Sequence, residues 1–216
     1  MDADGEKRLA ARAAAELVEA GMTVGLGTGS TVAHLLDELA ARSVDATYVA
    51  TSPRTDAAAR SLGLRVVEFT DVAQLDLAID GADQVAPDGW LVKGASGAMT
   101  RERVVAAAAA QFVVIVDSTK PVRVLHPPVP VEVLAFGLAS TLRELGTVTV
   151  RPDGLSPDGG VLCDLHCDVD DPGALASRLS LTPGIIGHGL FAPSMVAMVL
   201  VGDGDAVRTA HLGGTT

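Results

Sequence analysis

Short apolar runs alternate with amphipathic stretches through the first half of the chain. Residues 6–20 place Leu9, Ala13 and Leu17 at helical spacing on one face, and Gly21 follows where a helix would end. Apolar runs that fit short buried strands lie at residues 22–26, 47–50, 64–69, 75–79 and 112–116. Further amphipathic stretches separate these runs. Strands and helices that repeat in this way predict a parallel α/β layer.

The pattern changes after Lys120, where prolines gather at positions 121, 127, 128 and 130. Beyond them we expect a strand at 131–136, a helix at 139–145, strands at 147–151 and 161–168, a helix at 172–181, a loop at 183–191 and a strand at 195–201. The order β-α-β-β-α-β is that of the split βαβ plait. We therefore predict one domain over residues 1–127, to which residues 204–216 return, and a smaller α+β domain over residues 128–203.

Composition narrows the class of protein. Of the 216 residues, 48% are hydrophobic and 20% are charged, which is typical of a globular protein. A net charge of −11 without a basic stripe argues against nucleic-acid binding, and 3% aromatic residues disfavour a base-stacking platform. The first residues are charged, unlike a signal peptide. Residues 104–116, the longest apolar run, are too few to span a membrane. We expect a cytoplasmic protein that binds no membrane.

Cys163 and Cys167, with His166 between them, raise the question of a metal site. Within a strand over residues 161–168, side chains four positions apart are separated by about 13 Å. That distance is too long for one tetrahedral ion or for a disulfide, and His166 would point to the opposite face. We expect neither a metal nor a disulfide here.

A glycine-rich turn, GLGTGST at residues 25–31, connects the strand at 22–26 to the next amphipathic stretch. Glycines allow close backbone approach, and the first amides and the dipole of a helix favour an anion, so the turn is a candidate phosphate site. It is neither a Walker A loop nor a complete G-x-G-x-x-G motif. A tight turn with Ser30 as N-cap is the alternative. The TSPRT stretch at residues 51–55 is interpreted as a helix cap with Pro53 at the first helical position.

Five charged side chains lie in one apolar-framed segment, residues 75–120: Asp80, Asp83, Lys93, Glu102 and Lys120. Parallel strands at 75–79 and 112–116 would end at the same edge of the sheet, where open α/β sheets bind ligands. We predict that these charges meet around one small, polar, anionic substrate. Taken singly, each has a simpler explanation: aspartates form turns, Glu102 complements a helix dipole, and Lys120 is surface charge.

These pieces, in this order, resemble the ribose-5-phosphate isomerase A family over nearly the whole chain. The motifs that carry the resemblance are GLGTGST at 25–31, DGAD at 80–83, KGASGAMTRE at 93–102, DSTK at 117–120, PVEV at 130–133 and PGIIGHGLF at 183–191. The resemblance implies a Rossmann-like parallel-sheet domain with a smaller ferredoxin-like plait domain. It implies interconversion of ribose 5-phosphate and ribulose 5-phosphate, no metal or organic cofactor, and a homodimer or homotetramer.

The resemblance also implies roles for individual residues. Glu102 corresponds to the proton acceptor, with Asp80, Asp83 and Lys93 as further catalytic residues. The phosphate end would be lined by Thr28, Gly29, Ser30, Thr31 and Lys7. The sugar would be bound by Asp80, Gly81, Ala82, Asp83, Lys93, Gly94, Ala95, Ser96 and Lys120. Three departures from the family pattern are Gln84 for glutamate, Arg103 for lysine, and Ala95-Ser96 in a glycine-rich run, where added Cβ atoms restrict close approach.

Aldose–ketose isomerisation moves a proton between adjacent carbons through an enediol(ate), and one carboxylate can remove and return that proton. Lys93 and Lys120 can stabilise the developing oxyanion without a metal. Two other hypotheses are a non-catalytic sugar-phosphate-binding sensor domain and a structural α/β protein with solvated charges. The complete set of charges favours the enzyme.

Overall fold

The computed structural model describes residues 2–212, and the chain forms two compact units. Unit 1 comprises Met1–Ala82, Arg101–Lys120 and Pro193–Thr216, and unit 2 comprises Asp83–Thr100 and Pro121–Ala192. The chain therefore crosses from one unit to the other four times. These boundaries differ from the expected 1–127 and 128–203, because residues 83–100 and 121–127 belong to unit 2 and residues 193–203 to unit 1.

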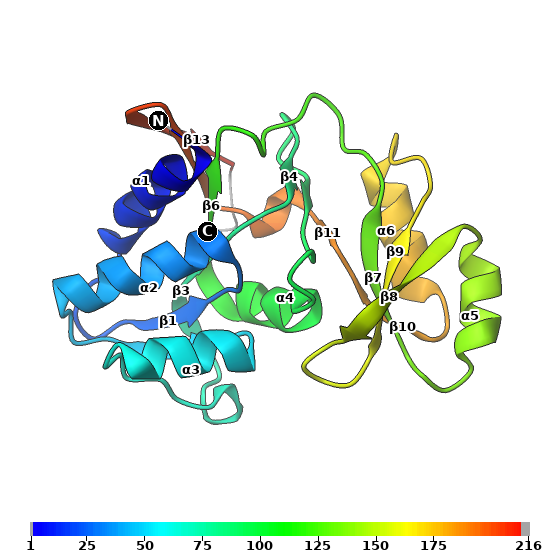
Figure 1. Ribbon diagram of the computed structural model, residues 1–216, viewed down its shortest axis with the longest axis horizontal. Coiled ribbons are helices and arrows are strands. Elements are labelled where there is room, and N and C mark those ends of the chain that lie inside the picture. The colour runs from blue at the N-terminus through cyan, green and yellow to red at the C-terminus, as the bar shows by residue number, and fades with distance from the viewer. Residues whose placement is uncertain (1, 213–216) are drawn as a thin grey trace. The chain divides into compact units, whose positions relative to one another are not determined.

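Unit 1 is built on a six-stranded sheet of order β13-β12-β6-β3-β1-β2 (Figure 1). Its strands are β1 (Thr23–Leu26), β2 (Thr47–Ala50), β3 (Leu75–Asp80), β6 (Ala109–Asp117), β12 (Met198–Asp203) and β13 (Ala206–His211). All neighbours are parallel except β12 and β13. The predicted parallel layer is confirmed, and β13 lies at the edge of the same sheet, paired with β12.

The helices of unit 1 differ in how they begin. They are α1 (Ala3–Ala15), α2 (Ser30–Arg42), α3 (Pro53–Ser61) and α4 (Met99–Ala108, unit 1 from Arg101), with 3-10 turns η1 (Phe69–Asp71) and η2 (Pro193–Met195). Asp2 caps α1 and Ser52 caps α3, with Pro53 at the first position as expected. Helices α1 and α2 pack side by side, and α1 also packs on β6 and β12.

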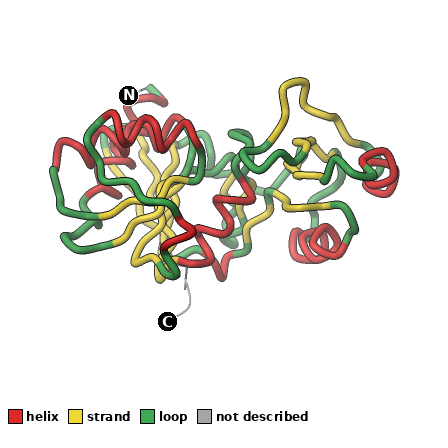
Figure 2. The backbone as a smooth tube through the Cα atoms, turned by 90° about the horizontal axis from the view of Figure 1, so that it is seen from below, coloured by secondary structure: helices red, strands yellow, loops and turns green. Residues whose placement is uncertain are grey.

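Unit 2 contains a four-stranded antiparallel sheet of order β10-β7-β9-β8. Its elements are β7 (Val129–Val133), α5 (Leu138–Leu145), β8 (Val148–Leu155), β9 (Val161–Leu165), α6 (Pro172–Leu181) and β10 (Ile185–His188). Helices α5 and α6 share one apolar core with β7 and β9 (Figure 1). A second small sheet has order β11-β5-β4, with β4 (Gln84–Val85), β5 (Leu91–Val92) and β11 (Leu190–Phe191). The strands are yellow in Figure 2.

The split βαβ plait is therefore present, but its last strand was predicted in the wrong place. The plait ends with β10 inside the 183–191 stretch, which we had predicted to be a loop, whereas the apolar run at 195–201 lies around β12 of the other sheet. The run at 64–69 is also not a regular strand. Only Val66 of that run is buried, and it makes a single bridge to Tyr48, because Arg65 and Glu68 interrupt the apolar pattern.

Among the described residues, every helix is too short or too polar to cross a membrane.

Candidate active site

The carboxyl ends of β1, β3 and β6 lie next to one another in the sheet of unit 1. The chain leaves β1 toward β2 on one side, while β3 and β6 lie on the other side. Such a reversal of strand order is the topological switch point at which open α/β sheets bind ligands. The glycine-rich turn follows β1, Asp80 ends β3, and the DSTK stretch begins at the end of β6. These three motifs therefore lie at the same edge of the unit 1 sheet.

Asp80 is held directly against the glycine-rich turn. Its carboxylate is 3% exposed, and Oδ1 accepts hydrogen bonds from the N–H groups of Thr28 at 3.1 Å and Gly81 at 2.7 Å. A Cβ atom at Gly27 would collide with this carboxylate. Glycine at position 27 thus allows a buried acidic group to lie beside the turn.

The turn ends in a helix N-terminus suited to an anion. Gly29, with φ of 148°, is the N-cap of α2, and among the described residues no side chain caps this helix. Ser30 is exposed in the first helical position and Thr31 is buried. The serine N-cap that we considered as an alternative is therefore wrong. The first amides of α2 are left to bind a ligand, as at many phosphate sites.

Glu102 is buried in the first turn of α4, with 2% of its surface exposed. The helix packs on β1 through Val105, since a Cβ atom at Gly25 would collide with Val105 Cγ1. Residues three apart share a helix face, so Glu102 lies one turn from this contact. Because α4 leads into β6, which is parallel to β1, its N-terminal turn lies at the carboxyl-end edge of the sheet.

Glu6 of α1 forms hydrogen bonds with the DSTK stretch at residues 117–120. Its carboxylate accepts hydrogen bonds from Ser118 Oγ at 2.7 Å, Gly204 N–H at 2.9 Å and Ser118 N–H at 3.0 Å. These bonds, with that from Ser118 Oγ largest, lower the pKa of Glu6 to about 2. The two predicted lysines in unit 1 are half-buried: Lys7 directly follows Glu6, and Lys120 lies two residues after Ser118. Sequence reasoning missed Glu6, because a charged residue in the first turn of a predicted helix is no sign of such a role.

Among the remaining predicted residues, Asp83 of unit 2 holds the loop that follows Lys93. Asp83 Oδ2 accepts a hydrogen bond from Ala95 N–H at 2.9 Å. Gly81 and Ala82, both half-buried, lead the chain from β3 to Asp83. Arg151 Nη1 donates to Gly94 O at 2.8 Å while its guanidinium pairs with both carboxylate oxygens of Asp164, at 2.9 and 2.7 Å. Sequence reasoning missed Arg151, since a lone arginine in a strand gives no sign of such a role.

The departures in this loop fall where the backbone tolerates them. Gly94 and Gly97 have φ of 116° and 80°, and a Cβ at Gly94 would lie 2.7 Å from Met99 Sδ and Pro130 Cβ. Both positions keep glycine. Ala95 and Ser96 are exposed and have no positive φ. The restriction that we expected from their Cβ atoms is therefore absent from the loop's own backbone.

Lys93 is 3% exposed, and its Nζ lies 5.5 Å from the ring centroid of Phe191. Its N–H donates to Gly189 O at 2.8 Å, so β5 and the stretch at 183–191 position the lysine together. Gln84 also has a local explanation. Its amide donates to His126 O at 2.8 Å and accepts from His126 N–H at 2.9 Å, a pair of bonds that a glutamate carboxylate cannot make.

Cys163 and Cys167 are free thiols, and burial raises the pKa of each. The strand β9 ends at Leu165, so only Cys163 lies in a strand. Across residues 2–212, no group of three or more His, Cys, Asp or Glu side chains is arranged to hold a metal ion.

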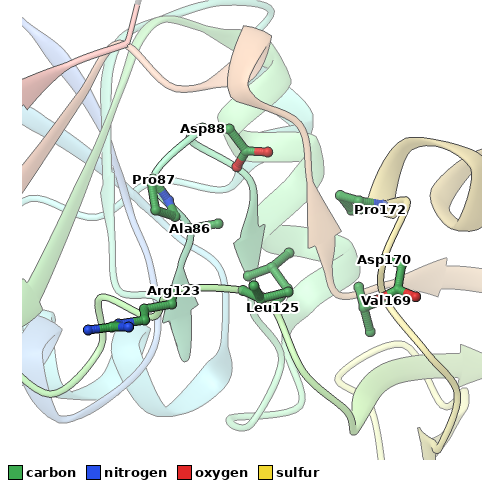
Figure 3. Close-up of a pocket in the computed structure, with 9 residues that line it drawn as sticks. Ala86, Pro87, Asp88, Arg123, Leu125, Val169, Asp170 and Pro172 are labelled. Carbon is green, nitrogen blue, oxygen red and sulfur yellow. The ribbon is translucent and has the colours of Figure 1, made fainter.

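A cavity of about 270 Å³ in unit 2 (Figure 3) is separate from the predicted residues. Its lining includes Arg123 with Asp88 and Asp170, and its other residues are apolar. None of the residues predicted to bind substrate lines it. A cavity with two acidic side chains and one basic side chain does not have the charge that a phosphate requires.

Comparisons with known sequences identify a family. The model of the family ribose 5-phosphate isomerase A (phosphoriboisomerase A) matches residues 47–206. Ribose-5-phosphate isomerase A from Caulobacter sp. (strain K31) is 43% identical, over 88% of this chain and 91% of the relative. The enzyme of the same name from Roseiflexus sp. (strain RS-1) is 40% identical, over 98% and 97%.

Solved structures give the same result. A crystal structure of ribose 5 phosphate isomerase A from Neisseria gonorrhoeae matches with a TM-score of 0.93 at 28% identity, over 98% of both chains. A structure of D-ribose-5-phosphate isomerase in complex with phospho-erythronic acid matches with a TM-score of 0.91 at 30% identity, over 98% of this chain and 100% of that one.

Proposed function

Because the chain belongs to the ribose-5-phosphate isomerase A family, we propose that it interconverts D-ribose 5-phosphate and D-ribulose 5-phosphate, with Glu102 as the base. The observation that carries the assignment of the base is the burial of this carboxylate in the first turn of α4, at the ligand-binding edge of the sheet. A single base suffices, since one carboxylate can take the proton from C2 and return it to C1.

The phosphate group binds at the N-terminus of α2, through the amides of Gly29, Ser30 and Thr31 and the hydroxyls of Ser30 and Thr31, with Lys7 as an additional cation. The uncapped start of α2 supports this role. Binding the non-reacting phosphate positions C1 and C2 relative to the base, so that binding energy is used to orient the reacting carbons.

Charge that develops on the substrate oxygens requires preorganised partners. Lys93 and Lys120 supply positive charge to the enediolate, and Asp80 and Asp83 bind sugar hydroxyls and assist ring opening. The bonds that Asp80 accepts from Thr28 and Gly81, and that Asp83 accepts from Ala95, support these roles because they fix each carboxylate before substrate arrives. Gly81, Ala82, Gly94, Ala95 and Ser96 complete the sugar-binding backbone.

We also propose that the protein is a cytoplasmic homodimer or homotetramer. Two free thiols, Cys163 and Cys167, suit a reducing compartment. Large apolar side chains in unit 2, among them Phe136 at 87% and Leu181 at 82% exposure, suit a surface that a second copy covers.

The experiment is turnover of ribose 5-phosphate, with EDTA present, by the wild type and Glu102→Gln. We expect metal-independent activity in the wild type and a loss of at least about 10³-fold in kcat for the variant, since the base acts on the reacting proton. Near-normal turnover by Glu102→Gln would remove this residue as the base. A folded wild type that binds the sugar phosphate without converting it would support a sensor domain instead.

A further inference from the structure

Four hydroxyl groups form a buried cluster beneath the glycine-rich turn of unit 1. They belong to Thr28, Thr51, Ser52 and Thr55, which are 8%, 1%, 6% and 5% exposed. Thr28 Oγ1 lies 2.9 Å from Thr51 Oγ1, 2.7 Å from Ser52 Oγ and 3.1 Å from Thr55 Oγ1. A helix cap requires only Ser52, whose Oγ accepts from Thr55 N–H at 3.1 Å. The other three hydroxyls are therefore not explained by capping.

The cluster has one direction of hydrogen bonding, because each hydroxyl carries a single proton. Thr55 must donate to Gly27 O at 2.9 Å, since a carbonyl oxygen only accepts. Ser52 then donates to Thr55 at 3.1 Å, and Thr28 donates to Ser52. The proton of Thr28 is thereby used, so Thr51 donates to Thr28. This chain of hydrogen bonds runs from Thr51 to Thr28, then to Ser52 and Thr55, and it ends on the backbone carbonyl of Gly27 in the glycine-rich turn.

Both donors of Thr28 are thus engaged within the protein. Its hydroxyl donates to Ser52, and its N–H donates to Asp80 Oδ1 at 3.1 Å. Neither is available to a phosphate oxygen without breaking a buried bond. The groups that remain for an anion are those of the next three residues, at the start of α2.

We propose that Thr51, Ser52 and Thr55 are positioning residues of the glycine-rich turn, which binds the phosphate, and that Thr28 links them to this turn instead of contacting the phosphate. The turn contains Gly27 and Gly29, and glycine loses more conformational freedom on ordering than any other residue. The hydroxyl chain fixes the turn by its carbonyl at Gly27 and its side chain at Thr28, and so orients the amides that follow. This inference rests on the proposed function for the identity of the substrate.

The test compares Thr55→Val, which keeps the shape of the side chain and removes the last donor, with Thr55→Ser, which keeps the donor. We measure kcat and KM for ribose 5-phosphate, and the Kd of inorganic phosphate by calorimetry. For Thr55→Val we expect KM and the phosphate Kd to rise by about three- to tenfold, as for the loss of one hydrogen bond, with kcat little changed. Thr55→Ser should restore both constants. Unchanged constants in Thr55→Val, or a fall in kcat alone, would overturn the proposal.

A double-mutant cycle shows whether Thr28 links the hydroxyl groups to the turn or contacts the phosphate directly. If Thr28 acts through the chain of hydrogen bonds, Thr28→Val and Thr55→Val weaken phosphate binding to similar extents. The double variant then binds phosphate only a little more weakly than either single variant. If Thr28 contacts the phosphate, its effect adds to that of Thr55→Val, and the proposal is wrong. Should Thr55→Val fail to fold, Thr51→Val replaces it, because this change removes only the first donor of the chain.

Asp76→Asn is the matched control for general destabilisation. Asp76 also accepts a hydrogen bond from a backbone amide of the sheet, Thr23 N–H at 2.8 Å, but at the opposite end of β1 from the glycine-rich turn. The phosphate Kd of Asp76→Asn should equal that of the wild type. A rise in this Kd as large as that of Thr55→Val would refute a specific role for the chain of hydroxyl groups. If the wild type binds phosphate but does not isomerise ribose 5-phosphate, the proposed function fails while the phosphate measurements still decide this inference.

Discussion

At the scale of single residues, glycine is required at some positions of the loop after Lys93 and not at others. Gly94 has a positive φ and lies against Met99 and Pro130, whereas Ala95 is exposed with an ordinary φ. The family resemblance showed that the loop differs from the usual pattern, but only the backbone angles show that the differences are tolerated.

Gly94→Ala should therefore lower the free energy of unfolding by about 1–3 kcal/mol, because alanine is strained at this φ and its Cβ collides with neighbours. Ala95→Gly, the matched change next to it, should cost no more than about 1 kcal/mol, through the entropy of the unfolded chain. Urea unfolding of both variants measures the difference. Equal losses would show that the loop does not depend on the conformation of residue 94.

Gln84 illustrates what residue types alone leave open. The sequence identified it as a departure from glutamate but gave no reason, because its partner is the backbone of His126, far along the chain. The same holds for Glu6 and Arg151, whose hydrogen-bond partners depend on the fold. By contrast, Asp80 and Glu102 could be selected as candidates from the sequence, since each lies next to a clear strand or helix pattern, and their roles stay predictions.

At the scale of elements, the packing of α4 on β1 depends on a residue without a side chain. Gly25→Ala places a methyl group against Val105, and overpacking of this kind costs about 1–3 kcal/mol. We expect kcat to fall as well, because a shift of α4 displaces Glu102. The double variant Gly25→Ala with Val105→Ala should recover stability and kcat in part. Turnover and urea unfolding test this, and a double variant worse than the sum of its single changes would contradict the packing argument.

Glu6 joins α1 to the ends of β6 and β12, and its low pKa makes this junction sensitive to acid. Because hydrogen bonds lower the pKa in the folded state from 4.5 to about 2, the carboxylate stabilises the fold above pH 4.5. That stabilisation is lost as the pH falls through about 2. The difference in unfolding free energy between wild type and Glu6→Gln should be constant above this range and shrink within it. Unfolding curves at several pH values measure it, and a difference that grew toward low pH would contradict the assignment.

The elements themselves were predicted unevenly. Helix α6 was predicted with its full extent, since Pro172 marks its first turn and the apolar pattern ends at Leu181. The apolar run at 195–201 was recognised as strand-forming but assigned to the wrong sheet. A continuous apolar strand fits either sheet. Which sheet it joins depends on the pairing of β12 with β6, and the local sequence does not show this pairing.

At the scale of the whole molecule, the apolar surface of unit 2 bears on assembly. Leu134 and Phe136 follow β7, Ile186 lies on the edge strand β10, and all three are exposed. Phe136→Asp should shift the protein toward a single chain, because a charge replaces apolar area at the surface where we propose a second copy binds. Phe136→Leu should not. Light scattering after size-exclusion chromatography measures both, and identical masses would exclude this surface from the interface.

The order in which the six-stranded sheet is completed has a consequence for synthesis. Strand β6 pairs with β3 and β12, yet the larger segment of unit 2, Pro121–Ala192, lies in the chain between β6 and β12. On the ribosome, one side of β6 therefore remains an open edge of unpaired backbone groups until the last strands emerge. A chain released early keeps that edge exposed, so it becomes a substrate for chaperones or an aggregation seed and not a shorter working enzyme.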